Sequence, residues 1–429
     1  MSQYMGYDGI SLEFLKKHMV VVGDSVKVEA DTTHVGIIMP RYEHADDKHI
    51  VLKLASGYNV GLEILGIKKI EKLDIQTPCV KMQEKQAHVK GLSKILLLST
   101  GGTIASKVDY RTGAVTPVLT AEELNASVPE LSKIANIDTE EVLSEYSENI
   151  MPKHWMRIAE KINNNIKSGY AGIIVAHGTD TMHYTSAFLS FALAGIPIPV
   201  LLVGSQRSSD RASSDAALNL IGAARLITSD ISGGIYVAMH QDTSDDMVAC
   251  HIGTRVRKNH TSKRGAFQTV GDKPAYIITD NNIQENFQGP FFKTDVFTPS
   301  IKLDSRVVLV KYHPGFDPKM LDWIVEAGYR GVIFEGTGLG HIGDITHESV
   351  KRAKDRGLFL GMTSQCIDGR VRMTVYESGR DLLNMGITPL EDMLPEVALV
   401  KAMWVFGKCD NAKEAEIAML EDIASEMSH

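Results

Sequence analysis

Hydrophobic and polar positions follow two different patterns along the chain, and the change falls near residue 94. Beyond it, continuous runs of branched aliphatic residues alternate with amphipathic segments. Such runs are typical of strands buried on both faces of a parallel sheet. Regular alternation with helices predicts βαβ units and a mainly parallel sheet. The predicted strands are Ile95–Leu98, Gly172–Ala176, Val200–Val203, Ile235–Met239, Val307–Val310, Val332–Glu335 and Leu358–Met362.

Helices are predicted between these strands. His154–Ile166 places Trp155, Ile158, Ala159 and Ile162 on one face. Asp317-Pro318 has the cap and first-turn proline of a helix start, and Gly328 ends that helix.

Two further helices are predicted. The end of the chain reads as a helix over Ala412–Met427, with Asp410 or Asn411 as its N-cap. The most apolar stretch, Ala187–Gly204, contains two prolines and a glycine, so it predicts a buried helix, a turn and a strand rather than a membrane span.

Residues up to about Gln83 show short, partly alternating strands separated by Gly, Asp or Pro turns. Their spacing predicts a small SH3-like β-barrel, and the Gln- and Lys-rich segment Lys81–Lys90 reads as a linker. The fold class expected is therefore α/β: a small N-terminal SH3-like β-barrel followed by a two-domain, parallel-sheet unit. The predicted divisions are residues 1–85 (barrel), 86–93 (linker), 94–285 (first α/β domain), 286–305 (linker) and 306–429 (second α/β domain).

The composition narrows the possible classes of protein. The 429 residues carry 45 basic and 53 acidic side chains, a formal charge of −8, which argues against a large autonomous nucleic-acid surface. No secretory signal is evident, and we expect a soluble, cytoplasmic protein. The four cysteines are widely spaced and predict reduced thiols rather than disulfides or a metal site: Cys79, Cys250, Cys366 and Cys409.

Two of the predicted strands end in a glycine followed by a threonine: Thr100-Gly101-Gly102-Thr103 and His177-Gly178-Thr179-Asp180. Ligands of open α/β sheets bind outside the carboxyl ends of strands, so both threonines are expected at one crevice. A threonine hydroxyl needs a base to act as a nucleophile. Asp180 and Lys258 could provide a proton relay; alternatively, Asp180 merely caps a helix over Thr181–Leu193.

Other catalytic signatures are missing from the sequence. It contains no G-x-x-x-x-G-K-[ST] phosphate loop, no G-x-S-x-G elbow and no H-E-x-x-H motif. The glycine-rich run Glu335–His341 follows a predicted strand and favours a tight loop lining a crevice over a nucleotide site.

The two threonine motifs resemble the signatures of the L-asparaginase/glutaminase family of threonine amidohydrolases. The agreement continues in family order through Ser147-Glu148, Gly204–Ser208 and the Lys258 segment, and it covers about Lys94 to the C-terminus. The resemblance implies that Thr103 attacks the substrate carboxamide and forms an acyl ester, with Thr179, Asp180 and Lys258 as relay.

The same resemblance implies the substrate contacts. Asp180 and Glu148 would bind the α-ammonium group of the substrate, Ser147 its α-carboxylate, and backbone N–H groups near Gly102 and Thr179 the oxyanion. Glu148 replaces the glutamine of simple secreted asparaginases, which could alter substrate preference.

Two more positions are compared with the family. Tyr110 is the nearest tyrosine to the family's flexible-loop position, although its offset is unusual; an exposed loop aromatic is the alternative. Asp215 and Asn219 match a helix start in the family, and we interpret them as structural.

The combination of barrel, linker and asparaginase-like unit resembles the D subunits of archaeal-type glutamyl-tRNA(Gln) amidotransferases. The resemblance implies that this chain hydrolyses glutamine and passes ammonia to the E subunit of such an enzyme. That partner uses ATP and Mg to activate Glu-tRNA(Gln), so this chain itself needs no cofactor. It also implies a homodimer within a heterotetramer of two copies of each chain, with RNA contact mainly through the partner. Glu335–His341 could complete a neighbouring copy's site.

Two alternatives stay open at this point. The chain could be a stand-alone cytosolic L-asparaginase with the barrel as an oligomerisation device. It could also be a non-enzymatic RNA- or protein-binding module, although the intact Thr103, Thr179, Asp180 and Lys258 argue against this. The barrel could pack against a partner or domain, which we favour, or contact tRNA directly.

Overall fold

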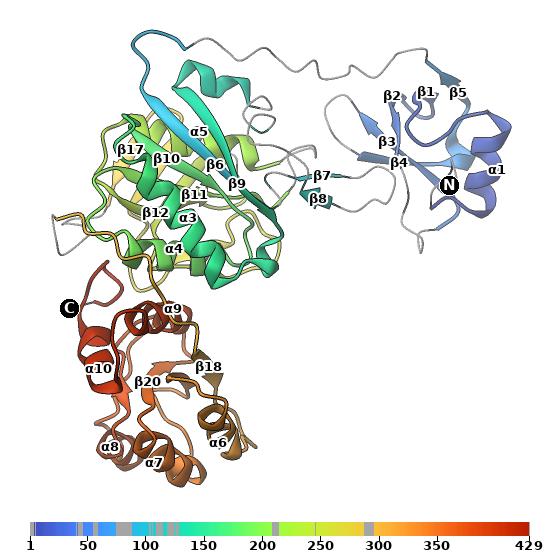
Figure 1. Ribbon diagram of the computed structural model, residues 1–429. Coiled ribbons are helices and arrows are strands. Elements are labelled where there is room, and N and C mark those ends of the chain that lie inside the picture. Colours follow the sequence, from blue (N-terminus) through green and yellow to red (C-terminus); the bar gives the residue numbers. More distant parts are fainter. Residues whose placement is uncertain are drawn as a thin grey trace.

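Three groups of secondary-structure elements follow one another along the chain (Figure 1). The computed structural model describes residues 4, 6–39, 41, 46–54, 59–73, 88–102, 104, 106–108, 115–117, 124, 128–207, 214–244, 246–286 and 296–428. Three residues singled out in the sequence, Cys79, Thr103 and Tyr110, lie outside this described part, as does most of the predicted linker over 81–90.

The first group is one helix and a five-stranded antiparallel sheet of order β4-β3-β2-β1-β5. Burial alternates along β1, so the side chains of Val26 and Val28 lie in a small hydrophobic core that belongs to this N-terminal unit. The short strands predicted for this region are present as β1 to β4. The helix and β5 were not recognised from the sequence. The elements are α1 (Gly9–Lys17), β1 (Ser25–Glu29), β2 (Thr33–Ile38), β3 (His49–Leu54), β4 (Asn59–Glu63), η1 (Ile64–Gly66) and β5 (Lys69–Lys72).

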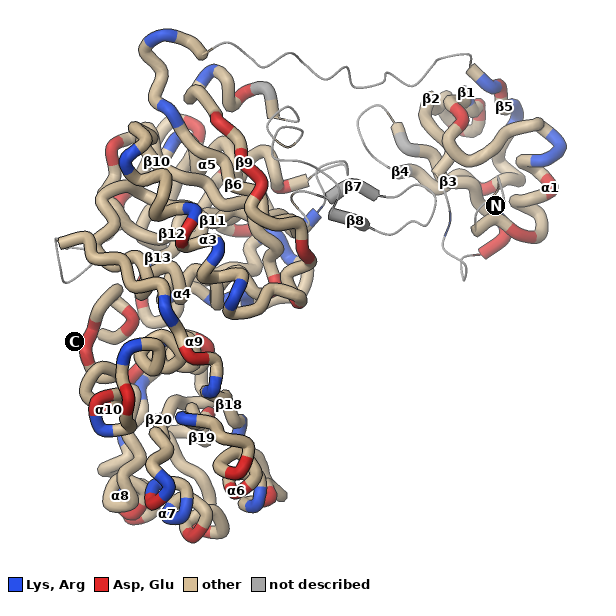
Figure 2. The backbone as a smooth tube through the Cα atoms, in the orientation of Figure 1, with Lys and Arg blue, Asp and Glu red and all other residues tan. Residues whose placement is uncertain are grey.

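Acidic and basic residues are interspersed along the backbone of this N-terminal unit (Figure 2). On its surface, Lys27 pairs with Glu29, and Lys72 pairs with Asp24 at 2.8 Å. Within the described residues of this unit, the charges therefore do not form the single-sign stripe typical of an RNA-binding face.

The second group is built on a mixed sheet of order β17-β16-β13-β12-β11-β10-β6-β9. The five strands from β9 to β12 are parallel, and the other three are antiparallel. Four of the five parallel strands were predicted, whereas β9 and the antiparallel extension were not anticipated. The strands are β6 (Lys94–Gly101), β9 (Asn136–Glu145), β10 (Gly172–Ala176), β11 (Pro199–Val203), β12 (Gly234–His240), β13 (Met247–Ile252), β16 (Tyr276–Thr279) and β17 (Ile283–Glu285).

Helices and smaller elements complete this domain. On α3, the four side chains predicted to share one face are all buried, which confirms that amphipathic pattern. The apolar stretch after residue 187 is confirmed as the end of α4, a turn and β11. These elements are η3 (Pro129–Lys133), η4 (Ser147–Asn149), α3 (Pro152–Asn165), α4 (Met182–Ala192), α5 (Ala216–Thr228) and the short hairpins β7 (Ser106–Val108) with β8 (Val115–Pro117) and β14 (Val256–Lys258) with β15 (Phe267–Thr269).

The third group forms a smaller parallel sheet of order β18-β19-β20-β21 with its own core. Its helix α9 packs against α4, and α9 side chains belong to the core cluster of the second group, so this helix joins the two domains. The elements are β18 (Val307–Lys311), α6 (Lys319–Glu326), β19 (Gly331–Gly336), η5 (Asp344–Thr346), α7 (His347–Asp355), β20 (Phe359–Ser364), α8 (Glu377–Asn384), β21 (Thr388–Pro389), α9 (Pro395–Phe406) and α10 (Ala412–Leu420).

The last helix is shorter than predicted. Asn411 is its N-cap and accepts a hydrogen bond from the Glu414 N–H, but the helix ends at Leu420 instead of Met427. The reason is Glu426, whose carboxylate accepts the N–H groups of Ile423 and Ala424 and lies 2.6 Å from the Lys401 ammonium group. This buried contact turns the chain back toward α9.

Two features are absent from the described ranges. No helix there is long and apolar enough to cross a membrane, and no group of three or more His, Cys, Asp or Glu side chains is arranged to hold a metal ion. The cysteines that the structure describes, Cys250, Cys366 and Cys409, are free thiols, as predicted.

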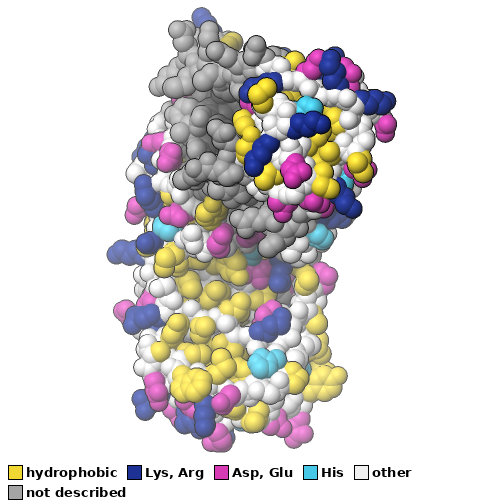
Figure 3. Space-filling view, turned by 90° about the vertical axis from the view of Figure 1, so that its right-hand side faces the viewer, with side chains coloured by type: hydrophobic (Ala, Val, Ile, Leu, Met, Phe, Trp, Pro, Cys, Tyr) yellow, Lys and Arg dark blue, Asp and Glu magenta, His cyan; other side chains and the backbone are white. Residues whose placement is uncertain are grey.

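Hydrophobic side chains gather on one face of the C-terminal domain (Figure 3). The exposed large hydrophobic residues of this domain include Met320 and Trp323 of α6 and Ile345 of η5.

Candidate active site

The two glycine–threonine motifs lie side by side because β6 and β10 are parallel neighbours, with Ala176 paired to Ser99. Thr100 Oγ1 donates a 2.9 Å hydrogen bond to the Ala176 carbonyl oxygen. A Cβ on Gly102, which has φ +79°, would lie only 2.3 Å from Gly178 Cα. The chain therefore needs glycine here, and the backbone before Thr103 touches the backbone before Thr179.

Lys258, at the end of β14, reaches the second motif. Its Nζ donates a 2.8 Å hydrogen bond to Thr179 Oγ1 and lies 2.7 Å from Asp180 Oδ1. Thr179 and the Lys258 side chain are buried, whereas 66% of the Asp180 side chain is exposed. The structure thus brings together three of the four predicted catalytic residues, although Lys258 is far from the other two in sequence.

Ser147 approaches the same carboxylate from η4. Its Oγ is a hydrogen-bond donor to Asp180 Oδ2 at 3.4 Å, and its carbonyl oxygen accepts a 2.7 Å bond from Thr181 Oγ1. Thr181 is the N-cap residue of α4. The alternative that Asp180 merely caps this helix is therefore wrong: its two oxygens face Lys258 and Ser147.

Of the remaining residues predicted to contact the substrate, the structure describes Glu148 and Gly102. Glu148 follows Ser147 on η4 and is exposed. The Gly102 N–H donates to the Glu145 carbonyl oxygen at 3.1 Å, so this N–H is already used within the fold. Thr103 and Tyr110 belong to the ranges that the structure does not describe.

The buried His177 side chain supports the second glycine–threonine motif. This residue was not identified from the sequence as part of the site. Its Nδ1 donates to the Gly178 carbonyl oxygen at 2.7 Å, so Nε2 accepts from Thr185 Oγ1 at 2.9 Å. Complete burial lowers the pKa of His177 to about 4, and the ring is neutral at pH 7. A hydroxyl residue eight positions later on the helix is the one sequence signal that could have indicated this pair.

Asp215 and Asn219 hold the loop that follows β11, in agreement with their structural interpretation. The Asp215 carboxylate accepts the N–H groups of Gln206 and Arg207, and Asn219 Nδ2 donates to the Gly204 carbonyl oxygen. A Cβ on Gly204 would lie 2.8 Å from Thr179 Cγ2, so this loop packs directly behind the candidate relay.

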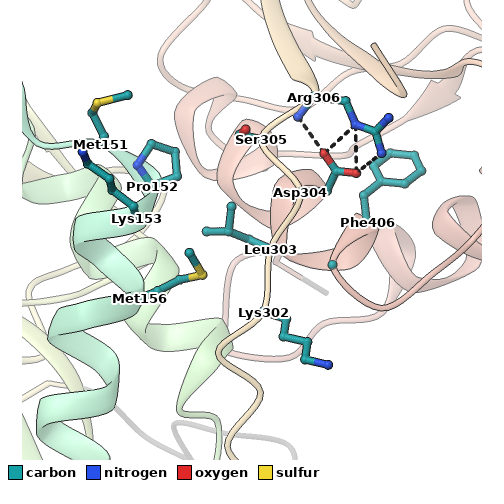
Figure 4. A pocket seen from close by; sticks show the side chains of 11 residues that line it. Met151, Pro152, Lys153, Met156, Lys302, Leu303, Asp304, Ser305, Arg306 and Phe406 are labelled. Carbon is teal, nitrogen blue, oxygen red and sulfur yellow. Dashed lines mark hydrogen bonds and ion pairs between the residues drawn. The ribbon is translucent and has the colours of Figure 1, made fainter. Parts of the chain in front are cut away.

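A pocket of about 570 Å³ lies elsewhere, between the start of α3 and the segment leading to β18 (Figure 4). The ion pair of Asp304 with Arg306 stands at its edge. None of the predicted site residues lines it, so it is not the candidate active site. Its lining residues are Met151, Pro152, Lys153, Met156, Lys302, Leu303, Asp304, Ser305, Arg306, Phe406 and Gly407.

Solved structures define the class of fold. The L-asparaginase from Thermococcus kodakarensis is 32% identical, superposes with a TM-score of 0.69, and aligns over 78% of this chain and 99% of its own. A probable cytoplasmic L-asparaginase from Campylobacter jejuni is 25% identical with a TM-score of 0.65, over 77% of this chain and 100% of its own. The predicted α/β class and the two-domain asparaginase-like unit are thereby confirmed.

Sequence families divide the chain in the same way. Residues 94–289 match the family described as asparaginase, N-terminal, and residues 306–419 match the glutaminase/asparaginase C-terminal domain. Residues 20–73 match the GatD N-terminal domain. The class is therefore an asparaginase-type chain that carries an additional N-terminal domain.

Full-length relatives identify the family more closely. The D subunit of glutamyl-tRNA(Gln) amidotransferase from Pyrococcus abyssi is 44% identical over 97% of both chains. The protein of the same name from Methanopyrus kandleri is 46% identical over 100% of this chain and 95% of its own. This chain belongs to the family of glutamyl-tRNA(Gln) amidotransferase D subunits, as the resemblance in its motifs suggested.

Proposed function

We propose that this chain hydrolyses glutamine through a threonyl acyl-enzyme and supplies the ammonia to a tRNA-dependent amidotransferase. The observation that carries the proposal is the contact of Lys258 Nζ with both Thr179 Oγ1 and Asp180 Oδ1. This relay lies beside the Gly102–Gly178 contact, and Thr103 is the next residue after Gly102. The family membership supports the same assignment.

In the proposed reaction, the Thr103 hydroxyl loses its proton to the relay of Thr179, Lys258 and Asp180 and adds to the side-chain carboxamide carbon of glutamine. The C–N bond breaks, the nitrogen takes up a proton, and ammonia leaves an acyl ester on Thr103. Water then adds to the ester and releases glutamate. Because the Gly102 N–H is bonded to Glu145, we assign the developing oxyanion to the N–H of Thr179.

The α-amino and α-carboxylate groups of glutamine would be held beside the relay. The exposed Asp180 carboxylate and Glu148 would bind the ammonium group, and the Ser147 hydroxyl would bind the carboxylate. Tyr110 would be a further substrate-binding residue. A carboxylate pair favours an amino acid over a simple amide, because the ammonium group is then paired on both sides.

Ammonia would pass to the E subunit, which would use ATP and Mg to activate Glu-tRNA(Gln) and convert it to Gln-tRNA(Gln). We place the complex in the cytoplasm as a heterotetramer with two copies of each chain. The exposed apolar surface of the C-terminal domain offers area for such contacts, and the loop Glu335–His341 would serve the neighbouring copy. We propose the same domain boundaries as the sequence predicts: between residues 85 and 86, 93 and 94, 285 and 286, and 305 and 306.

The test is ammonia release from glutamine by the full chain, alone and with the E subunit and Glu-tRNA(Gln). We expect hydrolysis in the complex and its loss in Thr103→Ala, while added ammonium chloride restores Gln-tRNA(Gln) formation by that variant. Retained glutamine hydrolysis in Thr103→Ala would overturn the acyl-enzyme assignment.

The similarity to the Thermococcus L-asparaginase supports a second candidate, a stand-alone asparaginase. The same assay with asparagine distinguishes the two. Fast asparagine turnover by the lone chain, unaffected by Glu-tRNA(Gln), would favour the second candidate.

A further inference from the structure

Glu396 is a buried carboxylate at the junction of the two asparaginase-like domains. It lies in the first turn of α9, and only 5% of its side chain is exposed. Helix α9 belongs to the C-terminal domain but packs against α4 of the preceding domain. A buried carboxylate at such a junction needs a partner that offsets its loss of hydration.

Its two neighbours come from the segments that carry the candidate relay. Arg257 Nε lies 3.3 Å from Glu396 Oε1, and Arg257 directly precedes Lys258 on β14. His183 Nε2 lies 4.0 Å from the same oxygen, and His183 stands in the first turn of α4, soon after Asp180. One carboxylate of the C-terminal domain therefore contacts both relay-bearing segments.

Burial and the neighbouring charges shift the pKa values of His183 and Glu396. Burial lowers the pKa of His183 to about 4, with the positive charges of Arg257 and Lys258 acting in the same direction, so the ring is neutral at pH 7. Burial raises the pKa of Glu396, while Arg257 opposes that rise and Glu335 adds to it. Arg257 is thus the cation that offsets part of the cost of burying the Glu396 carboxyl group.

Strand geometry explains how the ion pair of Arg257 with Glu396 can control the position of the Lys258 side chain. Successive residues of a strand point to opposite sides, so Arg257 faces Glu396 while Lys258 faces Thr179 and Asp180. Fixing Arg257 fixes the backbone from which Lys258 extends. The neutral His183 ring lies 4.0 Å from the same carboxyl oxygen, in the first turn of α4, which directly follows Asp180 and Thr181.

We propose that Glu396, Arg257 and His183 form an interdomain clamp that sets the distance between Lys258 and its partners Thr179 and Asp180. These three are positioning residues: they contact the segments that carry the relay and not the reacting atoms. The clamp makes glutamine hydrolysis depend on the docking of the C-terminal domain. It rests on the proposed function, because its effect is read through the hydrolysis that the relay performs.

The test compares kcat and KM for glutamine in the complex with the partner protein and Glu-tRNA(Gln). We expect Arg257→Gln and Glu396→Gln each to lower kcat about tenfold and to change KM less than about twofold, because a displaced relay impairs chemistry more than binding. The double variant should be no slower than either single variant, since both remove the same interaction. Arg257→Lys, which keeps the charge, should stay within about threefold of wild type.

Arg225→Gln is the matched control. Its side chain is 27% exposed, against 30% for Arg257, and Arg225 lies on α5, in the same domain but outside the clamp, where it pairs with Asp280. We expect kcat and KM of this variant to equal those of wild type. Thermal unfolding of all variants reports separately on folding.

The outcomes separate the clamp from the proposed function. No ammonia release by wild-type complex would overturn the proposed function. An active wild type with unchanged kcat in Arg257→Gln and Glu396→Gln would overturn the clamp alone. A double variant whose loss is the product of the single losses, a change confined to KM, or a kcat loss that merely follows the unfolded fraction would overturn it equally.

Discussion

The ammonium group of Lys258 lies 2.7 Å from Asp180 Oδ1 and approaches that carboxylate from the protein interior. The lysine side chain is 8% exposed, whereas the aspartate side chain is 66% exposed. Asp180 can therefore hold Lys258 on its buried side and still offer its open side to a positively charged substrate group. This division explains how one residue can serve both the relay and substrate binding.

Removing the Lys258 amine should abolish catalysis without unfolding the protein. We expect Lys258→Ala to lower kcat for glutamine by about 10²–10⁴, the usual contribution of a positioned proton-transfer group. Steady-state ammonia release measures this, and the exposed Lys273→Ala serves as control. Activity within about twofold of wild type in Lys258→Ala would contradict the relay.

The hydroxyl group of Thr179 should contribute more to kcat than its methyl group does. Thr179→Val keeps the volume of the side chain but removes the atom that Lys258 contacts, so we expect a fall in kcat of at least about a hundredfold. Thr179→Ser keeps the hydroxyl and should retain most of the activity. Equal rates in the two variants would exclude a role for this oxygen.

The contact between Gly102 and Gly178 gives a prediction about the backbone. Gly102→Ala places a Cβ 2.3 Å from Gly178 Cα, so it should both destabilise the domain and reduce kcat. Gly169 has the same φ of +79° but open space around its Cβ position, so Gly169→Ala should cost only about 1 kcal/mol. Urea unfolding of both variants, together with the activity assay, measures the difference. Equal losses of stability in the two variants would show that the positive φ, and not the close contact with Gly178, determines the cost of the substitution.

The ion pair of Lys401 with Glu426 should be essential for the C-terminal segment, because both side chains are fully buried. Glu426→Gln leaves the Lys401 charge without its partner, and we expect a loss of about 3–5 kcal/mol in the free energy of unfolding. Denaturant titration followed by Trp fluorescence measures this. Replacing both residues, as in Lys401→Met with Glu426→Leu, should recover part of the loss; a double variant as unstable as the sum of the singles would contradict the pairing.

Acid should destabilise the protein through its buried histidines. The pKa of His177 is lowered from 6.5 to about 4, so its contribution to stability is complete above pH 6.5 and is lost as the pH falls toward 4. We expect about 2 kcal/mol of this contribution to disappear between about pH 7.5 and pH 5. His177→Asn should reduce the pH dependence of the unfolding free energy by that amount, and the same substitution at the exposed His313 should not. An unchanged pH dependence in His177→Asn would refute the assignment.

Local patterns along the chain correctly predicted the parallel strands β6, β10, β11 and β12, the buried face of α3 and the end of α4. These features depend on residues that are close in sequence, such as the spacing of Trp155 and Ile162. The parallel edge strand β9 and the antiparallel strands β13, β16 and β17 were missed. β16 and β17 have only four and three residues, and such short runs carry weak periodicity. The predicted end of α10 was wrong because Glu426 pairs with the distant Lys401, and no local pattern encodes this interaction.

The sequence alone determined the class of fold, because apolar strands alternate with amphipathic helices, and it supplied the candidate site residues through two glycine–threonine strand ends and one lysine segment. Only the tertiary structure decided what the side chains contact. It showed that Asp180 faces Lys258 rather than the start of α4, that His177 lies beneath the site, and that Glu396 reaches the relay segments from another domain. The physical reason is that distance and burial set the strength of a charged contact, and both are fixed only when remote segments pack together.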